Sequence, residues 1–264
     1  MTSKLAVVFG GSGFIGRNVV RELALRGWRV RVAVRRPHHA QYLRPMGAVG
    51  QIQLFQSNVR YRPTIEAALA DADAVINLVG LLAQEGPQTF DAVQAGGTRN
   101  IAEAAAKAGI TNVVHVSAIG ADADSDSHYA RTKAAGEAAM RALVPSATIL
   151  RPSVVFGPKD DFFNKFAEMS RFSPALPLIG GGETKFQPVY VDDVADAVCA
   201  ALENDATDGH IYELGGPEVK SFKELMAMML GIIGRRRALI PLPFPVAGLM
   251  GTLGEIASIL PFVA

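Results

Sequence analysis

A cluster of glycines near the N-terminus is the first feature with chemical meaning. Gly11, Gly13 and Gly16 match the pattern GxGxxG, and Gly10, Gly13 and Gly16 also match GxxGxxG. Glycines permit a tight turn, and without Cβ atoms they let backbone N–H groups approach a pyrophosphate. A helix that begins at such a turn adds the positive end of its dipole. The pattern predicts a phosphate site, the alternative being a plain turn. Its candidate contacts are Gly10, Gly11, Ser12, Gly13, Phe14, Ile15 and Gly16.

Two arginines follow the second apolar segment, in the stretch VRVAVRRP. A site for NAD usually has an acidic residue here, which accepts hydrogen bonds from the ribose 2′-hydroxyl. Arg35 and Arg36 have no acidic neighbour, and two guanidinium groups suit a 2′-phosphate dianion. The sequence therefore favours NADP(H), the alternative being that one arginine is only a solvated strand end. Asn58, after the third segment, is a candidate hydrogen-bond partner for an adenine edge.

A tyrosine and a lysine are spaced for chemistry in HYARTKAAGE. Tyr129 and Lys133 are four residues apart in a predicted helix, so they lie on one face. A phenol can act as a general acid or base, and a neighbouring ammonium favours the phenolate. The pair is a candidate catalytic pair, or a pair that only holds a ligand.

The elements that position these residues alternate between short apolar runs and helical patterns. Such alternation predicts βαβ units, right-handed crossovers and a parallel sheet buried on both faces. The expected fold class is α/β, a doubly wound parallel sheet with a smaller C-terminal lobe. The predicted strands cover residues 5–9, 29–34, 52–55, 74–79, 113–117 and 148–150.

The sequence pattern changes after residue 151, where proline and glycine clusters interrupt the alternation of apolar runs and helical patterns. We expect a dinucleotide-binding domain over residues 1–151, a smaller lobe interleaved with it over 152–237, and an apolar docking segment over 238–264. Apolar residues recur on one helical face between 246 and 260, but prolines interrupt this amphipathic segment, so it is not a transmembrane span. The basic cluster before it suits an anionic membrane surface or an acidic partner; in the alternative, the helix caps the protein's own second lobe.

The composition narrows the remaining possibilities. The 264 residues carry a formal net charge of +1, which gives no argument for nucleic-acid binding. Cys199 is the single cysteine, so no internal disulfide and no multi-cysteine metal site is expected, and its helical neighbours predict a buried core residue. No metal site is predicted. The N-terminus has no secretory or organellar presequence, which favours a cytoplasmic protein.

Five motifs together resemble the extended or atypical branch of the short-chain dehydrogenase/reductase superfamily. They are GGSGFIG, NLVG, HVSAIGA, YARTK and LRPSVVFGP, and they span nearly the whole chain. The resemblance implies a Rossmann fold, Tyr129 as general acid/base, Lys133 as the residue that holds the nicotinamide ribose and lowers the tyrosine pKa, and a hydroxyl residue that polarises the substrate. Ser117 is the candidate for this catalytic hydroxyl if the chain is active. It is followed by Ala118, however, so the hydroxyl expected at the later position is missing. Further cofactor contacts are implied at Val79, Ser117, Tyr129, Lys133, Pro152 and Val155.

A closer resemblance is to the family of nucleotide-binding accessory subunits of respiratory complex I, in the bacterial form. It is carried by VVFGGSGFIGRNVVREL, NLVGLL, YARTKAAGE, FQPVYVDDVADAV and YELGGPEVKSFKELM. It implies a tightly held NADPH with a structural role, partner subunits near the peripheral arm, and a peripheral position on the cytoplasmic side of a bacterial inner membrane, with contact to the membrane surface through residues 235–264. Two alternatives stay open: an NADPH-dependent reductase, dehydrogenase or epimerase for a small carbonyl or sugar-nucleotide substrate, and a redox-sensing regulator that binds NADP(H).

Overall fold

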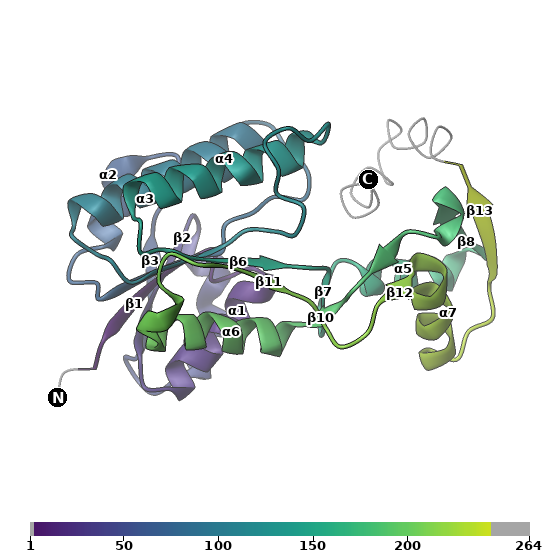
Figure 1. The fold of residues 1–264 in the computed structure, drawn as a ribbon. Coiled ribbons are helices and arrows are strands. Elements are labelled where there is room, and N and C mark those ends of the chain that lie inside the picture. The colour runs from purple at the N-terminus through teal and green to yellow at the C-terminus, as the bar shows by residue number, and fades with distance from the viewer. Residues whose placement is uncertain (1–2, 244–264) are drawn as a thin grey trace. The chain divides into compact units, whose positions relative to one another are not determined.

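The computed structural model describes residues 3–243 and contains one large parallel sheet (Figure 1). Its seven strands have the order β11-β6-β5-β4-β1-β2-β3, and all neighbours pair in parallel. The strands are β1 (Leu5–Phe9), β2 (Arg29–Val34), β3 (Ile52–Gln56), β4 (Ala74–Asn77), β5 (Val113–Val116), β6 (Thr148–Pro152) and β11 (Ile211–Leu214). Apart from the added β11, this is the strand order of doubly wound dinucleotide-binding folds, so the predicted fold class is confirmed.

Helices cover both faces of the sheet (Figure 1). One face carries α1 (Phe14–Leu25) and α6 (Val191–Glu203), and the other carries α2 (Arg62–Ala68), α3 (Gly96–Lys107) and α4 (His128–Leu143). Shorter helical segments are η1 (Pro37–Met46), η2 (Asp91–Ala95) and η4 (Asp205–Thr207). All five residues of β1 are buried, as a strand covered on both sides requires.

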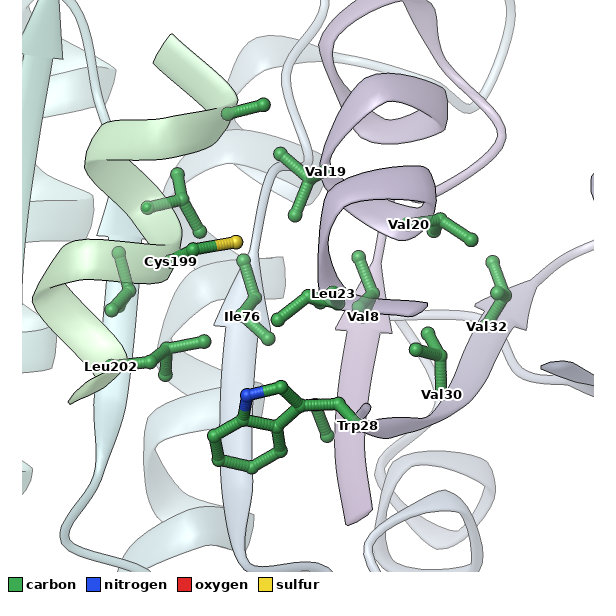
Figure 2. Packing of buried hydrophobic residues seen from close by; sticks show 14 of the residues in the cluster. Val8, Val19, Val20, Leu23, Trp28, Val30, Val32, Ile76, Cys199 and Leu202 are labelled. Carbon is green, nitrogen blue, oxygen red and sulfur yellow. The ribbon is translucent and has the colours of Figure 1, made fainter. Parts of the chain in front are cut away.

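The layer between α1, α6 and the sheet is a continuous apolar core (Figure 2). Val19 and Leu23 of α1 meet Val8 and Ile76 of the sheet. Cys199 of α6 lies in this layer, and burial raises the pKa of its thiol to about 12. The expectation that this cysteine is a core residue is confirmed.

A second unit contains short strand pairs and two helices around an aromatic core. Phe162, Phe166 and Phe222 pack edge to face at its centre. Ser221 begins α7 with a capping box that includes Glu224. Its elements are β7 (Val155–Phe156), α5 (Phe163–Phe172), β8 (Ala175–Ile179), η3 (Gly180–Gly182), β9 (Lys185–Phe186), β10 (Val189–Tyr190), β12 (Lys220–Ser221), α7 (Phe222–Ile232) and β13 (Ala238–Leu242).

The structure divides the chain differently from the expected limits 1–151, 152–237 and 238–264. The first compact unit joins residues 1–152 to 191–214, because α6 packs on α1 and β11 extends the large sheet. Among the described residues, the second unit holds 153–190 and 215–243. Residues 238–242 are not part of a separate docking segment, since β13 pairs in parallel with β8. The amphipathic helix expected between 246 and 260 lies outside the described residues. Within residues 3–243, no helix is both long and apolar enough to cross a membrane.

Candidate functional site

The candidate residues gather where the parallel strands end. Phe9 is in register with Asn77 on one side and with Ala33 on the other, and Asn77 is in register with His115. The chain runs outward in both directions from β1 and β4, so the strand order reverses between these two strands. In open α/β sheets, ligands bind at the carboxyl ends of the strands at such a reversal.

The glycine turn between β1 and α1 is close-packed. Gly10 has a φ of +78°, and a Cβ there would lie 2.9 Å from the backbone of Leu78. A Cβ on Gly16 would lie 2.2 Å from the carbonyl oxygen of Gly10. By contrast, Gly13 is exposed, and a Cβ there would be 3.3 Å from its nearest neighbour. Packing therefore requires Gly10 and Gly16, while Gly13 leaves an open backbone face at the start of α1. Such a face suits a phosphate group.

Arg35 and Arg36 are exposed at the end of β2. Neither side chain forms a hydrogen bond or an ion pair among residues 3–243. Some other arginines of this unit are paired with carboxylates, such as Arg151, which binds Glu137 at 2.7 Å. Glu22 is the only acidic residue among the first 65 of the chain. Two unpaired guanidinium groups without a competing carboxylate can accept a phosphate dianion.

Asn58 lies one residue beyond Ser57, just after β3, and its backbone and side chain are partly engaged. Its Oδ1 accepts a hydrogen bond from the Arg60 N–H at 3.1 Å, and its own N–H donates to Thr64 Oγ1 at 3.0 Å. The side-chain NH₂ group has no partner among the described residues. This leaves a hydrogen-bond donor for a ring nitrogen.

Tyr129 and Lys133 lie on one face of α4, as their spacing predicts. The Lys133 Nζ lies 5.9 Å from the centroid of the Tyr129 ring, so the ammonium sits over the ring. Lys133 exposes only 5% of its surface and has no carboxylate or hydrogen-bond partner within residues 3–243. Burial lowers the pKa of Lys133 to about 8, although Glu137 opposes the shift. Burial raises the pKa of Tyr129 to about 12.

Three buried polar atoms beside this pair have no hydrogen-bond partner in the described part of the chain. They are Gln94 Oε1, His115 Nε2 and Ser117 Oγ. By contrast, Asn77 Nδ2 in the same region contacts both Thr98 Oγ1 and His115 Nδ1 at 3.1 Å. Burial and the Lys133 charge lower the pKa of His115 to about 3, so its ring is neutral. Buried polar groups are normally paired, so an unpaired set indicates room for a polar ligand or water.

Sequence reasoning missed several residues of this region. Gln94 comes from the π-helical segment η2 and belongs to none of the motifs, while His115 begins the motif HVSAIGA inside β5 but was not singled out as a site residue. Tyr42 donates a hydrogen bond to the Ser12 carbonyl oxygen, a contact across 30 residues that no local pattern announces. The i, i+4 spacing of Tyr129 and Lys133 was the one local signal available.

The remaining predicted contacts are distributed over both units. Val79 follows β4, and its N–H donates to Asn77 Oδ1 at 3.1 Å. Ser117 directly follows β5, and Pro152 ends β6, so both belong to the carboxyl edge of the sheet. Val155 lies in β7 of the second unit. Ala118 occupies the next position after Ser117, where it offers no hydroxyl.

The site fits the phosphates and the sugar of a dinucleotide. The open backbone at Gly13 and the free guanidinium groups suit phosphates, while the buried Lys133 ammonium and Ser117 hydroxyl suit sugar hydroxyls or an amide. When bound, a nicotinamide dinucleotide supplies hydride transfer. Among residues 3–243, no group of three or more His, Cys, Asp or Glu side chains is arranged to hold a metal ion.

Curated relatives resemble this chain over most of its length. It is 39% identical over 249 residues to the mitochondrial NADH dehydrogenase (ubiquinone) 1 alpha subcomplex subunit 9 of Arabidopsis thaliana, covering 93% of this chain and 62% of the relative. The mouse subunit of the same name is 34% identical, with 98% of this chain and 68% of the relative covered. A ceramide reductase of Caulobacter vibrioides is 30% identical, with coverage of 91% and 74%. The chain thus spans about two thirds of the length of the mitochondrial subunits that it matches.

Solved structures share the fold. The UDP-glucose 4-epimerase of Thermus thermophilus in complex with NAD has a TM-score of 0.74 at 24% identity, with 90% of this chain and 86% of that chain covered. A dTDP-glucose 4,6-dehydratase of Bacillus anthracis in complex with NAD has a TM-score of 0.76 at 18% identity, with coverage of 91% and 85%. The sequence itself matches one family over residues 6–215. Because this match includes both the glycine turn and the Tyr129–Lys133 helix, the chain belongs to the NAD-dependent epimerase/dehydratase family, with subunits of respiratory complex I among its homologues.

Proposed function

We propose that the chain is an NADP(H)-holding accessory subunit of a membrane-associated respiratory NADH:quinone oxidoreductase, in which the dinucleotide stabilises the subunit and is not turned over. The observation that carries this proposal is the 39% identity, over 93% of the chain, to a subunit of mitochondrial NADH dehydrogenase. A further relative is the 40 kDa subunit of the Neurospora crassa NADH-ubiquinone oxidoreductase, at 32% identity.

The choice of NADP(H) rests on the end of β2. Arg35 and Arg36 are exposed and unpaired in the described structure, and the segment after them contains no carboxylate to receive a ribose 2′-hydroxyl. A 2′-phosphate would be the negatively charged partner that these two guanidinium groups lack among the described residues.

The proposal that the cofactor is not turned over rests on the protonation of Tyr129. A catalytic phenol works best with a pKa near the working pH, whereas burial raises that of Tyr129 to about 12. Lys133 lies over the ring, and burial is the dominant influence on this pKa. Ala118 also removes a hydroxyl that a substrate carbonyl would need. The pair therefore suits the holding of a ribose better than proton transfer.

The proposal places the chain beside a bacterial inner membrane, on its cytoplasmic side, and the surface of the second unit supports a peripheral position as such. Phe172, at the end of α5, exposes 83% of its surface, and Ile232, at the end of α7, exposes 78%. Arg235 and Arg237 both donate to the Ser170 carbonyl oxygen, at 3.1 and 2.7 Å, so the basic cluster is anchored to the end of α5. Exposed apolar groups beside arginines suit an anionic membrane surface or an acidic partner subunit.

Fractionation of cells that express a tagged chain tests this proposal. We expect the chain to stay with the membranes after a wash in high salt, to be solubilised only by detergent together with other respiratory subunits, and to carry NADPH in about one copy per chain. Salt screens the contacts of a protein held by lipid charge alone, so such a protein would be released by the wash. Mass spectrometry of the purified assembly identifies both the partners and the dinucleotide.

Recovery of the chain as a free monomer or dimer without respiratory subunits would contradict the assembly role. Purification of the intact assembly without any dinucleotide would contradict the cofactor role alone. A chain tagged at the other terminus is the control for interference by the tag.

A second function, an NADPH-dependent reductase, is favoured by one specific observation. Relatives with reductase names include the ceramide reductase at 30% identity and a quinoline-oxide ketoreductase of Stigmatella aurantiaca at 28% identity. In this function Tyr129 is the proton donor to a carbonyl, and Lys133 orients the nicotinamide ribose.

Replacement of Tyr129 by phenylalanine separates the two functions. If the chain is a reductase, Tyr129→Phe is expected to lower turnover at least 100-fold, because general acid catalysis contributes about 10² to 10⁴. NADPH should still bind, because the glycine turn and Lys133 remain and the ring stays against Phe90. If the chain is a retained subunit, the unchanged protein shows no substrate-dependent oxidation of NADPH, and Tyr129→Phe leaves assembly intact. Tyr212→Phe in β11 is the matched control.

A further inference from the structure

Tyr42 joins two segments that are distant in sequence. It lies in η1, the helical segment after β2, and its Oη donates a hydrogen bond of 2.6 Å to the carbonyl oxygen of Ser12. Ser12 is the central residue of the glycine turn. The bond therefore holds η1 against the turn that begins α1, across 30 residues of chain.

Arg17 of α1 contacts the same ring. Its Nε donates to the carbonyl oxygen of Gly13 at 3.2 Å, and its guanidinium carbon lies 5.4 Å from the centroid of the Tyr42 ring. A guanidinium over an aromatic face is attracted by the negative face of the ring. Ser12 and Gly13 are thus both linked to Tyr42, one directly and one through Arg17.

The two unpaired arginines lie directly before η1, the segment that contains Tyr42. Arg36 is the residue that precedes η1, and Arg35 precedes it. Their side chains have no partner in the described part of the chain. Their backbone directly follows β2, which pairs with β1, and Ala40 and Leu43 anchor η1 in the core. Tyr42 adds a direct link between η1 and the glycine turn.

We infer that Tyr42 is a positioning residue that couples two phosphate-binding parts of one site. The glycine turn receives the pyrophosphate, which NADH and NADPH share, and Arg35 and Arg36 receive the 2′-phosphate, which only NADPH carries. The tether keeps these parts at the spacing that a single NADPH molecule spans. It thereby sets the preference for NADPH over NADH, and this inference rests on the proposed function.

Tyr42→Phe removes the hydroxyl and keeps the ring under Arg17. A single hydrogen bond is worth about 1 kcal/mol, so we expect about a five-fold weaker binding of NADPH and no change for NADH, both measured by calorimetry on the full chain. A merely structural role would weaken both dinucleotides equally. Tyr61→Phe is the matched control, because Tyr61 is also exposed beneath a guanidinium, that of Arg60 at 6.0 Å, and its hydroxyl has no partner within residues 3–243.

Two further measurements complete the test. In a protein that already carries Arg35→Ala and Arg36→Ala, Tyr42→Phe is expected to have no additional effect on NADPH binding, since the coupled group is gone. Hydrogen exchange of the dinucleotide-free protein is expected to speed up in residues 37–46 of Tyr42→Phe and to stay unchanged in Tyr61→Phe.

The possible outcomes distinguish the inference from the proposed function. Three results would each overturn the role of Tyr42 while leaving the proposal of NADPH binding intact. The first is an equal loss of affinity for NADH and NADPH, and the second is an effect of Tyr42→Phe no larger than that of Tyr61→Phe. The third is unchanged hydrogen exchange over residues 37–46. Failure of the unchanged protein to bind either dinucleotide would overturn the proposed function and the coupling together.

Discussion

Replacement of Arg35 and Arg36 by alanine is expected to weaken NADPH binding about 100-fold and to leave NADH binding unchanged. A hydrogen bond to a charged group contributes about 1.5–3 kcal/mol, and two such contacts to one phosphate make a loss of this size or larger. The folded protein itself should keep its stability, because both side chains are exposed and neither forms a hydrogen bond or an ion pair with another described residue. NADH lacks the 2′-phosphate, so its affinity measures the rest of the site.

The measurement is a calorimetric titration of both dinucleotides at two salt concentrations. Arg29→Ala with Arg141→Ala is the matched control, since it removes the same charge from the start of β2 and the last turn of α4. A loss of NADPH affinity equal to that of this control, or an equal loss for NADH, would show that Arg35 and Arg36 do not recognise the 2′-phosphate.

Most of the large sheet was predictable because its strands are apolar runs. The predicted strand over residues 5–9 coincides with β1, and that over 29–34 coincides with β2. The strand β11 escaped prediction, because Ile211–Leu214 is a short edge strand whose residues are largely exposed. Its place beside β6 depends on pairing between residues about 60 positions apart, which no local pattern encodes.

The candidate site was predictable only where neighbours in sequence are also neighbours in space. The glycine turn and the Tyr129–Lys133 pair are local features of this kind, each belonging to one turn or one helix. Gln94, His115 and Tyr42 are different, because separate elements bring them to the site. The absence of any partner for a buried side chain, as for Lys133, is likewise visible only in three dimensions.

The unpaired ammonium of Lys133 connects stability with ligand binding. Burial without a carboxylate partner penalises the charged form, and this is the cause of its lowered pKa. The unfolded chain therefore binds more protons than the folded chain between the folded pKa of about 8 and the ordinary value of 10.5. In the dinucleotide-free protein, the free energy of unfolding attributable to this residue rises with pH across that interval and is lowest below pH 8.

Lys133→Met is accordingly expected to stabilise the dinucleotide-free protein at pH 7 by about 3 kcal/mol, which corresponds to the lowered pKa at about 1.4 kcal/mol per unit. The gain should fade toward pH 10.5, where the unchanged lysine is neutral in the folded chain and half neutral in the unfolded chain. NADPH should stabilise this variant less than the unchanged protein, because a ligand raises stability by RT ln(1 + [L]/Kd) and the variant lacks the ammonium for the ribose. Urea unfolding at pH 7, 9 and 10.5, with and without NADPH, measures the free energy of unfolding in each case.

Lys107→Met is the control, since Lys107 is exposed in an ion pair with Glu66 and should change stability by about 0.5 kcal/mol or less. If Lys133→Met instead destabilises the free protein at pH 7, the ammonium has a favourable partner in the folded chain, and Lys133 is a structural residue rather than one kept at a cost for its ligand.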